Sequence, residues 1–414
     1  KKNMKKINPY KPNHPVSPGM FAGRIEEIQS LEKGLHQTKN GYPSNFLLTG
    51  ERGIGKSSLL SLIKPFANGD LPSVEYDNFN FVTVNIVISP RTTLTSLIKL
   101  IDRVLKRELG KIEKLKTFLD STWSFVQRIK IMDSGIESDK NTEQLDLIID
   151  DFSYSLAETC KRISKVEGGE KAKDGIVFFI DEADNSCPDL HLGYFFKIVT
   201  ELLAQHGCNN IMFIVAGLPD LIEKLTNSHE SSIRIFNHLI IKELYPEDRR
   251  YVVDRGLKEG NKINEEKTTI TLDAKNLIST LSEGYPHFIQ QFSYSSFEYN
   301  SDGEISKDDV NGGAFGTGGA LDEIGTRYYQ SAYNEQIKSD DYREVLSIMA
   351  ENMNSWIKKS EIREKFSGAD HTITDALKAL TRRKIILKNP SKNGEYRLQQ
   401  RGFALWIKLF GERD

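Results

Sequence analysis

The segment GERGIGKSS, at residues 50–58, constrains this sequence more than any other feature. It matches the pattern G-x-x-x-x-G-K-[ST] at Gly50, Gly55, Lys56 and Ser57. The short apolar run NFLLTG precedes the glycine loop, and SSLLSLIKPFA follows it with leucine and isoleucine at helical spacing. A strand, a glycine loop and a helix in this order bring backbone N–H groups and a helix N-terminus onto one anion. The sequence therefore predicts a phosphate-binding loop rather than an incidental turn.

The residues of this loop have separate expected roles. Gly53 adds a position that is free to adopt a positive φ. Lys56 is expected to contact the β- and γ-phosphates of ATP during catalysis, and Ser57 to ligate Mg²⁺. The predicted nucleotide-binding residues of the loop are Gly50, Gly53, Ile54, Gly55, Lys56, Ser57 and Ser58.

A second motif, DGIVFFIDEAD at residues 174–184, supplies the acidic groups that such a site needs. Its five apolar residues, 176–180, indicate a strand that is buried on both faces. The strand ends in two adjacent carboxylates, of which we assign Asp181 to the metal ion and Glu182 to activation of the attacking water. A polar turn after a core strand is the alternative, and Asp184 is interpreted as a local cap.

Two more strands are expected at FVTVNIVI (81–88) and NIMFIVAG (210–217). Apolar runs that alternate with helical stretches predict an α/β fold, in which a parallel sheet has helices on both faces. Ligands bind such sheets at the carboxyl ends of the strands. Both motifs fall at such ends, so the sequence places the glycine loop and the acids in one site.

The entry segment PVSPGMFAGRIEEIQSLEKGL, residues 15–35, resembles that of AAA+ and STAND-type P-loop ATPases. In those families an F-x-G-R-x-x-E-I element precedes the first helix and lies by the adenine, and it is matched at Phe21, Gly23, Arg24 and Glu27. The resemblance implies that Phe21 and Arg24 bind nucleotide. It is strongest to the branch that contains replication-origin ATPases and relatives with a C-terminal winged helix.

The same resemblance suggests two residues that act on the nucleotide from outside the loop. SSIRIFNHLIIKELYPEDRR (231–250) resembles the end of the family's ATPase core, which makes Arg234 a candidate catalytic finger for a neighbouring subunit. EGYPHFIQQF (283–292) resembles the lid motif, which places His287 where relatives have a second sensor. A surface arginine and a packed or capping histidine are the alternatives.

The sequence departs from the family where the fourth strand ends. Relatives have a polar residue there that contacts the attacking water, whereas this chain has Ala216, Gly217 and Leu218. This departure raises a second hypothesis, in which hydrolysis is slow and the nucleotide acts as a switch.

Pattern and composition divide the chain into four predicted parts. These are an extended arm at 1–20, a P-loop ATPase core at 21–245 with a helical insertion at about 92–166, a helical lid and hinge at 246–335, and a winged helix-turn-helix domain at 336–414. The insertion carries Trp123, Phe125, Phe152 and Tyr154, which we interpret as helix–helix core, with an assembly surface as the alternative. The glycine- and acid-rich segment 300–323 is the predicted hinge.

The predicted winged helix consists of three helices and a hairpin. Residues 352–410 contain thirteen Lys and Arg against five Asp and Glu, a local charge of about +8 in a chain of net charge −2. The residues expected to face outward on or near the third helix and on the wing are Thr372, Asp375, Lys378, Arg382, Arg383, Lys392 and Arg397. This pattern is typical of a surface for double-stranded DNA, although many winged helices bind proteins and Asp375 would repel phosphate.

These features give two hypotheses of different classes. The first is an Mg²⁺-dependent AAA+-type ATPase that forms a homo-oligomer and binds DNA, in replication, transposition or defence. The second is a slow STAND-like switch whose winged helix docks a protein effector. Three scattered cysteines favour a reducing compartment, and the longest apolar runs are too short for a bilayer. We therefore expect a cytoplasmic protein with no membrane partner.

Overall fold

The computed structural model describes residues 6–12, 21–73, 75–110, 113–133, 142–165, 172–337, 339–352, 355–383, 385–389 and 392–411. It divides into two compact units, which are treated separately below. The core unit is Ser17–Lys242, and the lid unit combines Lys1–Val16 with Glu243–Asp414. Among the described helices, none is both long and apolar enough to cross a lipid bilayer.

The core unit is built on a five-stranded sheet of order β2-β3-β4-β1-β5. Every neighbouring pair in this sheet is parallel. The strands are β1 (Asn45–Thr49), β2 (Val82–Val87), β3 (Ile176–Asp181), β4 (Ile211–Gly217) and β5 (Phe236–Ile240). Strands β1 and β4 are buried along their whole length, which explains why their sequences are continuous apolar runs instead of alternating ones. The predicted α/β fold is confirmed.

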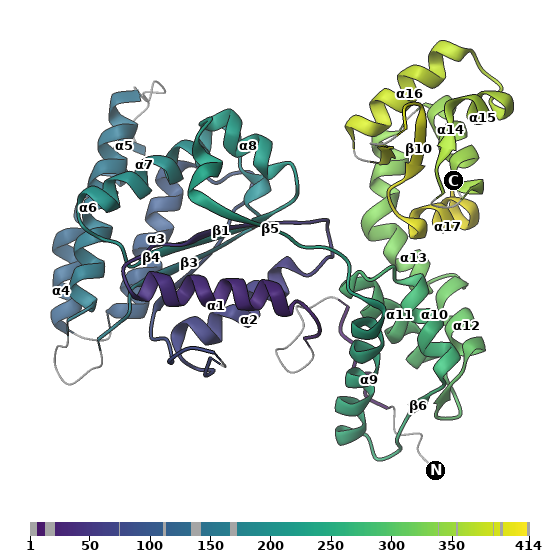
Figure 1. The fold of residues 1–414 in the computed structure, drawn as a ribbon, viewed down its shortest axis with the longest axis horizontal. Coiled ribbons are helices and arrows are strands. Elements are labelled where there is room, and N and C mark those ends of the chain that lie inside the picture. The colour runs from purple at the N-terminus through teal and green to yellow at the C-terminus, as the bar shows by residue number, and fades with distance from the viewer. Residues whose placement is uncertain are drawn as a thin grey trace. The chain divides into compact units, whose positions relative to one another are not determined.

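Helices cover both faces of the core sheet, as Figure 1 shows. They are α1 (Ile25–Lys39), α2 (Lys56–Asn68), α7 (Leu192–Gln205) and α8 (Leu221–Ser228), besides those of the insertion. On one face Gly34 of α1 lies so close to Phe46 that an added Cβ would be 2.3 Å from the ring. On the other face Phe196 of α7 packs edge-on against Phe213 of β4, with 5.5 Å between ring centroids.

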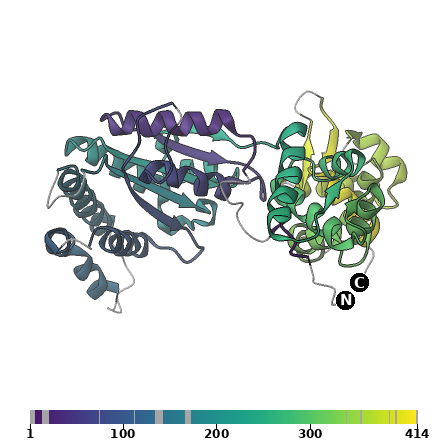
Figure 2. The same cartoon turned by 90° about the horizontal axis from the view of Figure 1, so that it is seen from below.

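The insertion between β2 and β3 is helical, and Figure 2 shows its helices (blue) grouped at one end of the core unit. They are α3 (Leu94–Leu109), α4 (Glu113–Thr122), α5 (Phe125–Asp133) and α6 (Thr142–Ile163). Trp123, Phe125 and Phe152 are buried in the same hydrophobic core as the sheet. The sequence predicts Tyr154 as part of the helix–helix core, but 53% of the residue's surface is exposed.

The first part of the lid unit is a set of helices with a small two-stranded sheet. Its elements are α9 (Pro246–Ile263), β6 (Thr269–Ile270), α10 (Leu272–Leu281), α11 (Pro286–Tyr299), β7 (Glu304–Ile305), α12 (Lys307–Phe315) and α13 (Ala320–Ile324), followed by π-helical turns at Gly325–Tyr329 and Ser331–Gln336. The segment 300–323, which we predict as a hinge, therefore contains helices. Val310 and Ala314 of α12 are buried, and Ser306 with Asp309 forms a capping box at its start.

The C-terminal part of the lid unit has the element order of a winged helix. It comprises α14 (Asp340–Glu351), β8 (Ile357–Lys358), α15 (Lys359–Lys365), α16 (Asp370–Arg382), β9 (Ile386–Lys388), β10 (Glu395–Leu398) and α17 (Arg401–Phe410). The three strands form an antiparallel sheet of order β8-β10-β9. Three helices and the hairpin were predicted from the sequence, whereas β8 and α17 were not.

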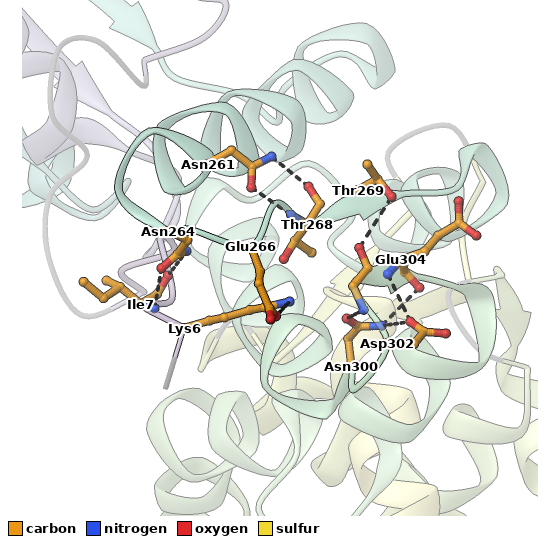
Figure 3. Close-up of polar contacts among 11 residues, drawn as sticks. Lys6, Ile7, Asn261, Asn264, Glu266, Thr268, Thr269, Asn300, Asp302 and Glu304 are labelled. Atoms are coloured by element: carbon orange, nitrogen blue, oxygen red, sulfur yellow. Dashed lines mark hydrogen bonds and ion pairs between the residues drawn. The ribbon is translucent and has the colours of Figure 1, made fainter. Parts of the chain in front are cut away.

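Residues 6–12 of the predicted arm pack within the lid unit, as Figure 3 shows for Lys6 and Ile7. The backbone of Ile7 donates to Asn264 Oδ1 (2.8 Å) and accepts from Asn264 Nδ2 (2.9 Å). Tyr10 is 2% exposed, and its hydroxyl donates to the carbonyl of Val253 (2.7 Å). Residues 6–12 are therefore part of the packing of α9.

Candidate nucleotide-binding site

The glycine loop connects the end of β1 to the start of α2. Gly53 and Gly55 have φ values of 78° and 101°, a left-handed conformation that favours glycine. Gly50 is fixed by packing, since an added Cβ would be 2.7 Å from the carbonyl oxygen of Ile241. Gly55 also precedes α2 and has no side chain to cap the first N–H groups of that helix. The loop thus presents uncapped backbone donors, as an anion site requires.

Lys56 lies folded over this loop. Its Nζ donates to the carbonyl oxygens of Gly50 (2.7 Å) and Glu51 (3.0 Å). Burial lowers the pKa of the Lys56 ammonium, and the charges of Asp184, Asp181, Glu51 and Glu182 oppose that shift, in decreasing order. Lys56 therefore faces acidic groups that come from the end of β3.

Those acids follow β3 at the carboxyl edge of the sheet. Asp181 is the last residue of β3, and its Oδ1 accepts the N–H of Glu182 (2.9 Å). Glu182 is exposed and has a φ of 53°, an uncommon conformation for a residue with a side chain. Its Oε2 accepts from Asn185 Nδ2 (3.2 Å). In this turn the Asp181 carboxylate therefore accepts a backbone N–H, whereas the Glu182 carboxylate accepts from the side chain of Asn185.

The strand register places the two motifs at the same edge. Thr49 pairs with Gly217, and Ile180 pairs with Val215, so the ends of β1 and β3 flank the end of β4. The sheet order puts β4 between the strand of the glycine loop and the strand of the acids. The structure therefore brings Lys56, Ser57, Asp181 and Glu182 to one end of one sheet. A residue at the end of β4 lies between the two motifs.

Of the two residues suggested by the entry segment, Arg24 contacts the loop. Gly23 and Arg24 both have positive φ values, 67° and 64°, just before α1. The Arg24 guanidinium donates to the carbonyl of Ile54 (3.1 Å) and lies 3.6 Å from the carboxylate of Glu27. Phe21 is half-buried at the beginning of this stretch.

Arg234 lies at the opposite edge of the sheet. It is exposed, in the short 3-10 turn Ser232–Ile235 that comes immediately before β5. Phe236 pairs with Asn45, the first residue of β1, whereas the glycine loop follows Thr49 at the other end of that strand. Five residues of strand, about 17 Å, therefore separate the level of Arg234 from the level of the loop in its own chain.

His287 belongs to the lid unit, and its sensor role stays a prediction. It is the second residue of α11, after Pro286. Its ring packs against Phe288 and Tyr328, with centroid separations of 6.1 and 5.2 Å. These contacts agree with the packed histidine that we gave as the alternative.

Two contacts at the site were not foreseen. Thr49 Oγ1 lies 2.7 Å from His238 Nε2, so the last residue of β1 is tied to β5. Asp184 Oδ1 accepts the N–H of Leu218 (3.0 Å), which joins the turn after β3 to the end of β4. Sequence reasoning gave Asp184 only a local role, because nothing in the sequence indicates that this turn reaches the next strand.

Residues 20–190 match the family described as the AAA ATPase domain. The match covers the entry segment from residue 20 onward, the glycine loop, the insertion and both acids. These residues are similar to an AAA ATPase domain. Because such a domain binds and hydrolyses ATP, the chain is an ATPase, as predicted. No curated protein matches the chain in sequence.

Solved structures share the fold of this chain over nearly its whole length. The ORC2 protein of Aeropyrum pernix in its ADPNP–ADP complexes is 13% identical, with a TM-score of 0.54, over 95% of this chain and 93% of that chain. The ADP form of the same protein is 14% identical, with a TM-score of 0.51, over 96% and 94%. At such low identities the likeness establishes a common fold.

Proposed function

We propose that this chain is an Mg²⁺-dependent ATPase whose nucleotide state controls assembly and a DNA-binding winged helix. The observation that carries the proposal is the meeting of Lys56, Ser57, Asp181 and Glu182 at one edge of the sheet. The ORC2 structure with the same fold holds ADPNP and ADP, which supports a nucleotide in the corresponding place here.

The residues at the loop suit Mg²⁺. Ser57 offers an exposed hydroxyl at the start of α2, and Asp181 offers a carboxylate at the end of β3. Mg²⁺ is bound through few oxygen ligands of this kind together with phosphate oxygens and water. When bound, the ion would neutralise the charge that develops on the phosphates.

The protein's own groups account for the remaining chemistry. Lys56 would exchange its bonds to the carbonyls of Gly50 and Glu51 for bonds to the β- and γ-phosphate oxygens. Glu182 would accept a proton from the water that attacks the γ-phosphorus, and the bond to the bridging oxygen breaks to leave ADP and phosphate. Arg24 would hold the loop from the adenine side through Ile54.

The C-terminal domain supplies the proposed DNA surface. Lys378, Arg382 and Arg383 are exposed on α16 or directly after it, and Lys392 is exposed on the hairpin. Exposed cations along the third helix are the pattern expected of a helix that enters the major groove. Arg397 does not belong to this set, because it is half-buried over the ring of Trp356 at 5.0 Å.

A second function, the slow switch with a protein effector, is favoured by a different observation. The end of β4 has no polar side chain, and Trp356, directly before β8, is 39% exposed beside the guanidinium of Arg397. An exposed tryptophan next to an arginine is typical of protein–protein contacts. In this alternative the C-terminal domain docks a protein rather than DNA.

ATP turnover by the wild type, Lys56→Ala and Glu182→Gln, each with and without duplex DNA, tests the proposal. We expect Lys56→Ala to lose nucleotide binding and turnover. Glu182→Gln should keep nucleotide but lose about 10²- to 10⁴-fold in turnover, since it lacks the base. Lys64→Ala, which removes a lysine from the far part of α2, is the matched control and should behave as the wild type.

DNA distinguishes the two functions. Binding that weakens steeply between low and physiological salt, with turnover that rises on DNA, supports the DNA-coupled ATPase. Tight ATP binding with negligible turnover that DNA does not change supports the switch. Normal turnover in Lys56→Ala would reject the nucleotide site itself.

A further inference from the structure

The end of β4 has no room for the polar side chain that the family's pattern places there. A Cβ added to Gly217 would lie 2.7 Å from Leu221 Cδ2, 2.9 Å from Asp184 Oδ1 and 3.0 Å from the backbone nitrogen of Asp184. Contacts this short require a neighbour to move. The small residue at position 217 is therefore imposed by Asp184 and α8.

Asp184 itself occupies the space that a side chain at position 217 would need. Its Oδ1 accepts the N–H of Leu218 (3.0 Å), and its carbonyl accepts from Lys224 Nζ of α8. The residue thus joins three elements, namely the turn after β3, the end of β4 and α8. Only one carboxylate oxygen has a hydrogen bond among the described residues, which leaves Oδ2 able to accept another.

The charge of Asp184 acts on the catalytic lysine. Four carboxylates oppose the lowering of the Lys56 pKa that burial causes, and Asp184 has the largest effect among them, ahead of Asp181. Asp181 has its Oδ1 engaged with the N–H of Glu182, and Glu182 points an oxygen at Asn185. The carboxylate with the largest effect on the pKa of Lys56 is therefore Asp184, which accepts the N–H of Leu218 just after β4.

We propose that Asp184 is a positioning residue for ATP hydrolysis. From the turn after β3, its carboxylate supplies the polar group that the end of β4 lacks. It fixes that end beside the glycine loop and orients Lys56 when the lysine leaves the carbonyls of Gly50 and Glu51 for the phosphates. This inference rests on the proposed nucleotide site. It means that an apolar end of β4 does not by itself make the enzyme slow.

Asp184→Asn tests the role, because asparagine can still accept the N–H of Leu218 but has no charge. We expect its kcat for ATP to fall about 10- to 100-fold, less than the loss of a general acid or base, because Asp184 acts through other groups. The Kd for a fluorescent ATP analogue should change less than threefold, and the melting temperature should stay within a few degrees. Asp189→Asn, which changes an exposed carboxylate five residues further on, is the control and should keep the wild-type kcat.

The outcomes separate this inference from the proposed function. An unchanged kcat in Asp184→Asn, with turnover lost in Lys56→Ala, overturns the role of Asp184 and leaves the nucleotide site standing. Parallel loss of kcat, nucleotide affinity and melting temperature in Asp184→Asn also overturns it, since a purely structural cap explains that result. Turnover that survives in Lys56→Ala rejects the proposed site instead.

Discussion

Glu283 has a φ of 51°, a conformation that few residues other than glycine adopt. Its carboxylate accepts the N–H groups of Arg401 (2.9 Å) and Gly402 (3.1 Å), in the first turn of α17. Burial raises the pKa of Glu283, although these N–H groups and the charges of Arg401 and Arg397 lower it. A buried carboxylate at a helix N-terminus satisfies donors that would otherwise lack partners. This one residue joins the turn before α11 to the C-terminal domain.

Replacement of Glu283 should destabilise the lid unit, because the N–H groups of Arg401 and Gly402 lose their acceptor. We expect Glu283→Ala to lower the free energy of unfolding by about 2 kcal/mol, because two partly buried N–H groups lose a charged acceptor. Glu283→Gln keeps an acceptor and should cost about half as much. Urea denaturation followed by circular dichroism measures both, and equal stabilities for the two variants would contradict the role assigned to the acceptor.

The direction of the Glu283 pKa shift also predicts a pH dependence. Because the pKa is raised in the folded state, its contribution to stability is complete below the ordinary value of 4.5 and is lost as pH rises through the raised value. The wild type should therefore lose stability relative to Glu283→Gln between pH 4.5 and neutral pH. A stability difference between the wild type and Glu283→Gln that stays constant over this pH range would contradict the raised pKa of Glu283.

At the scale of elements, the N-terminal arm and α9 form one packed structure. Gly256 and Gly260 lie one turn apart on α9, beneath Tyr10 and Pro9 of the arm. A Cβ on Gly256 would lie 2.2 Å from the Tyr10 ring, and one on Gly260 would lie 2.8 Å from Pro9. Glycine is unfavourable inside a helix, so these positions indicate that close approach of the arm outweighs helix propensity.

Gly256→Ala should therefore displace the arm, even though alanine is the better helix former. The substitution gains about 1 kcal/mol of helix propensity. It loses the burial of Tyr10, about 2 kcal/mol or more, besides the bond to Val253. We expect a lower melting temperature and at least tenfold faster hydrogen exchange in residues 6–12, measured by mass spectrometry. Lys258→Ala, on the exposed face of α9, is the control. Unchanged exchange in Gly256→Ala would contradict the packing.

At the scale of the whole molecule, the position of Arg234 bears on assembly. It is exposed at the amino edge of the sheet, whereas the glycine loop of the same chain lies at the carboxyl edge. Arg234 therefore cannot reach its own nucleotide within the folded core unit. If it is a catalytic finger, it serves the site of a second copy, which requires a head-to-tail interface.

A mixture of two inactive variants tests this arrangement. Lys56→Ala keeps the arginine but has no functional loop, and Arg234→Ala keeps the loop but has no finger. In an equal random mixture, half of the loops are intact and half of their neighbours carry the arginine, so about a quarter of wild-type turnover should return. A rate no higher than the mean of the separate variants would contradict action between subunits. Arg91→Ala, which removes another exposed arginine of the core unit, is the control for Arg234→Ala.

The strands of the core sheet and the place of the candidate nucleotide site along the chain could be predicted from local sequence patterns. Continuous apolar runs specify buried parallel strands. A glycine loop at the end of one run and two acids at the end of another are enough to predict where the candidate nucleotide site lies along the chain. These are local patterns, since each depends on neighbouring residues and on a burial that apolar composition already implies.

Which residues meet across elements could be learned from the three-dimensional structure alone. The capping box at Ser306 makes a helix of a segment whose glycines indicate a hinge, because packing against α11 rewards small residues there. Asp184 with Leu218, Glu283 with α17, and Tyr10 with α9 are contacts between segments that lie far apart or on separate strands. Such contacts depend on strand order, register and close backbone approach, none of which a local pattern encodes. The site could be located from its motifs, but the residues that hold it in position appeared only when the sheet was assembled.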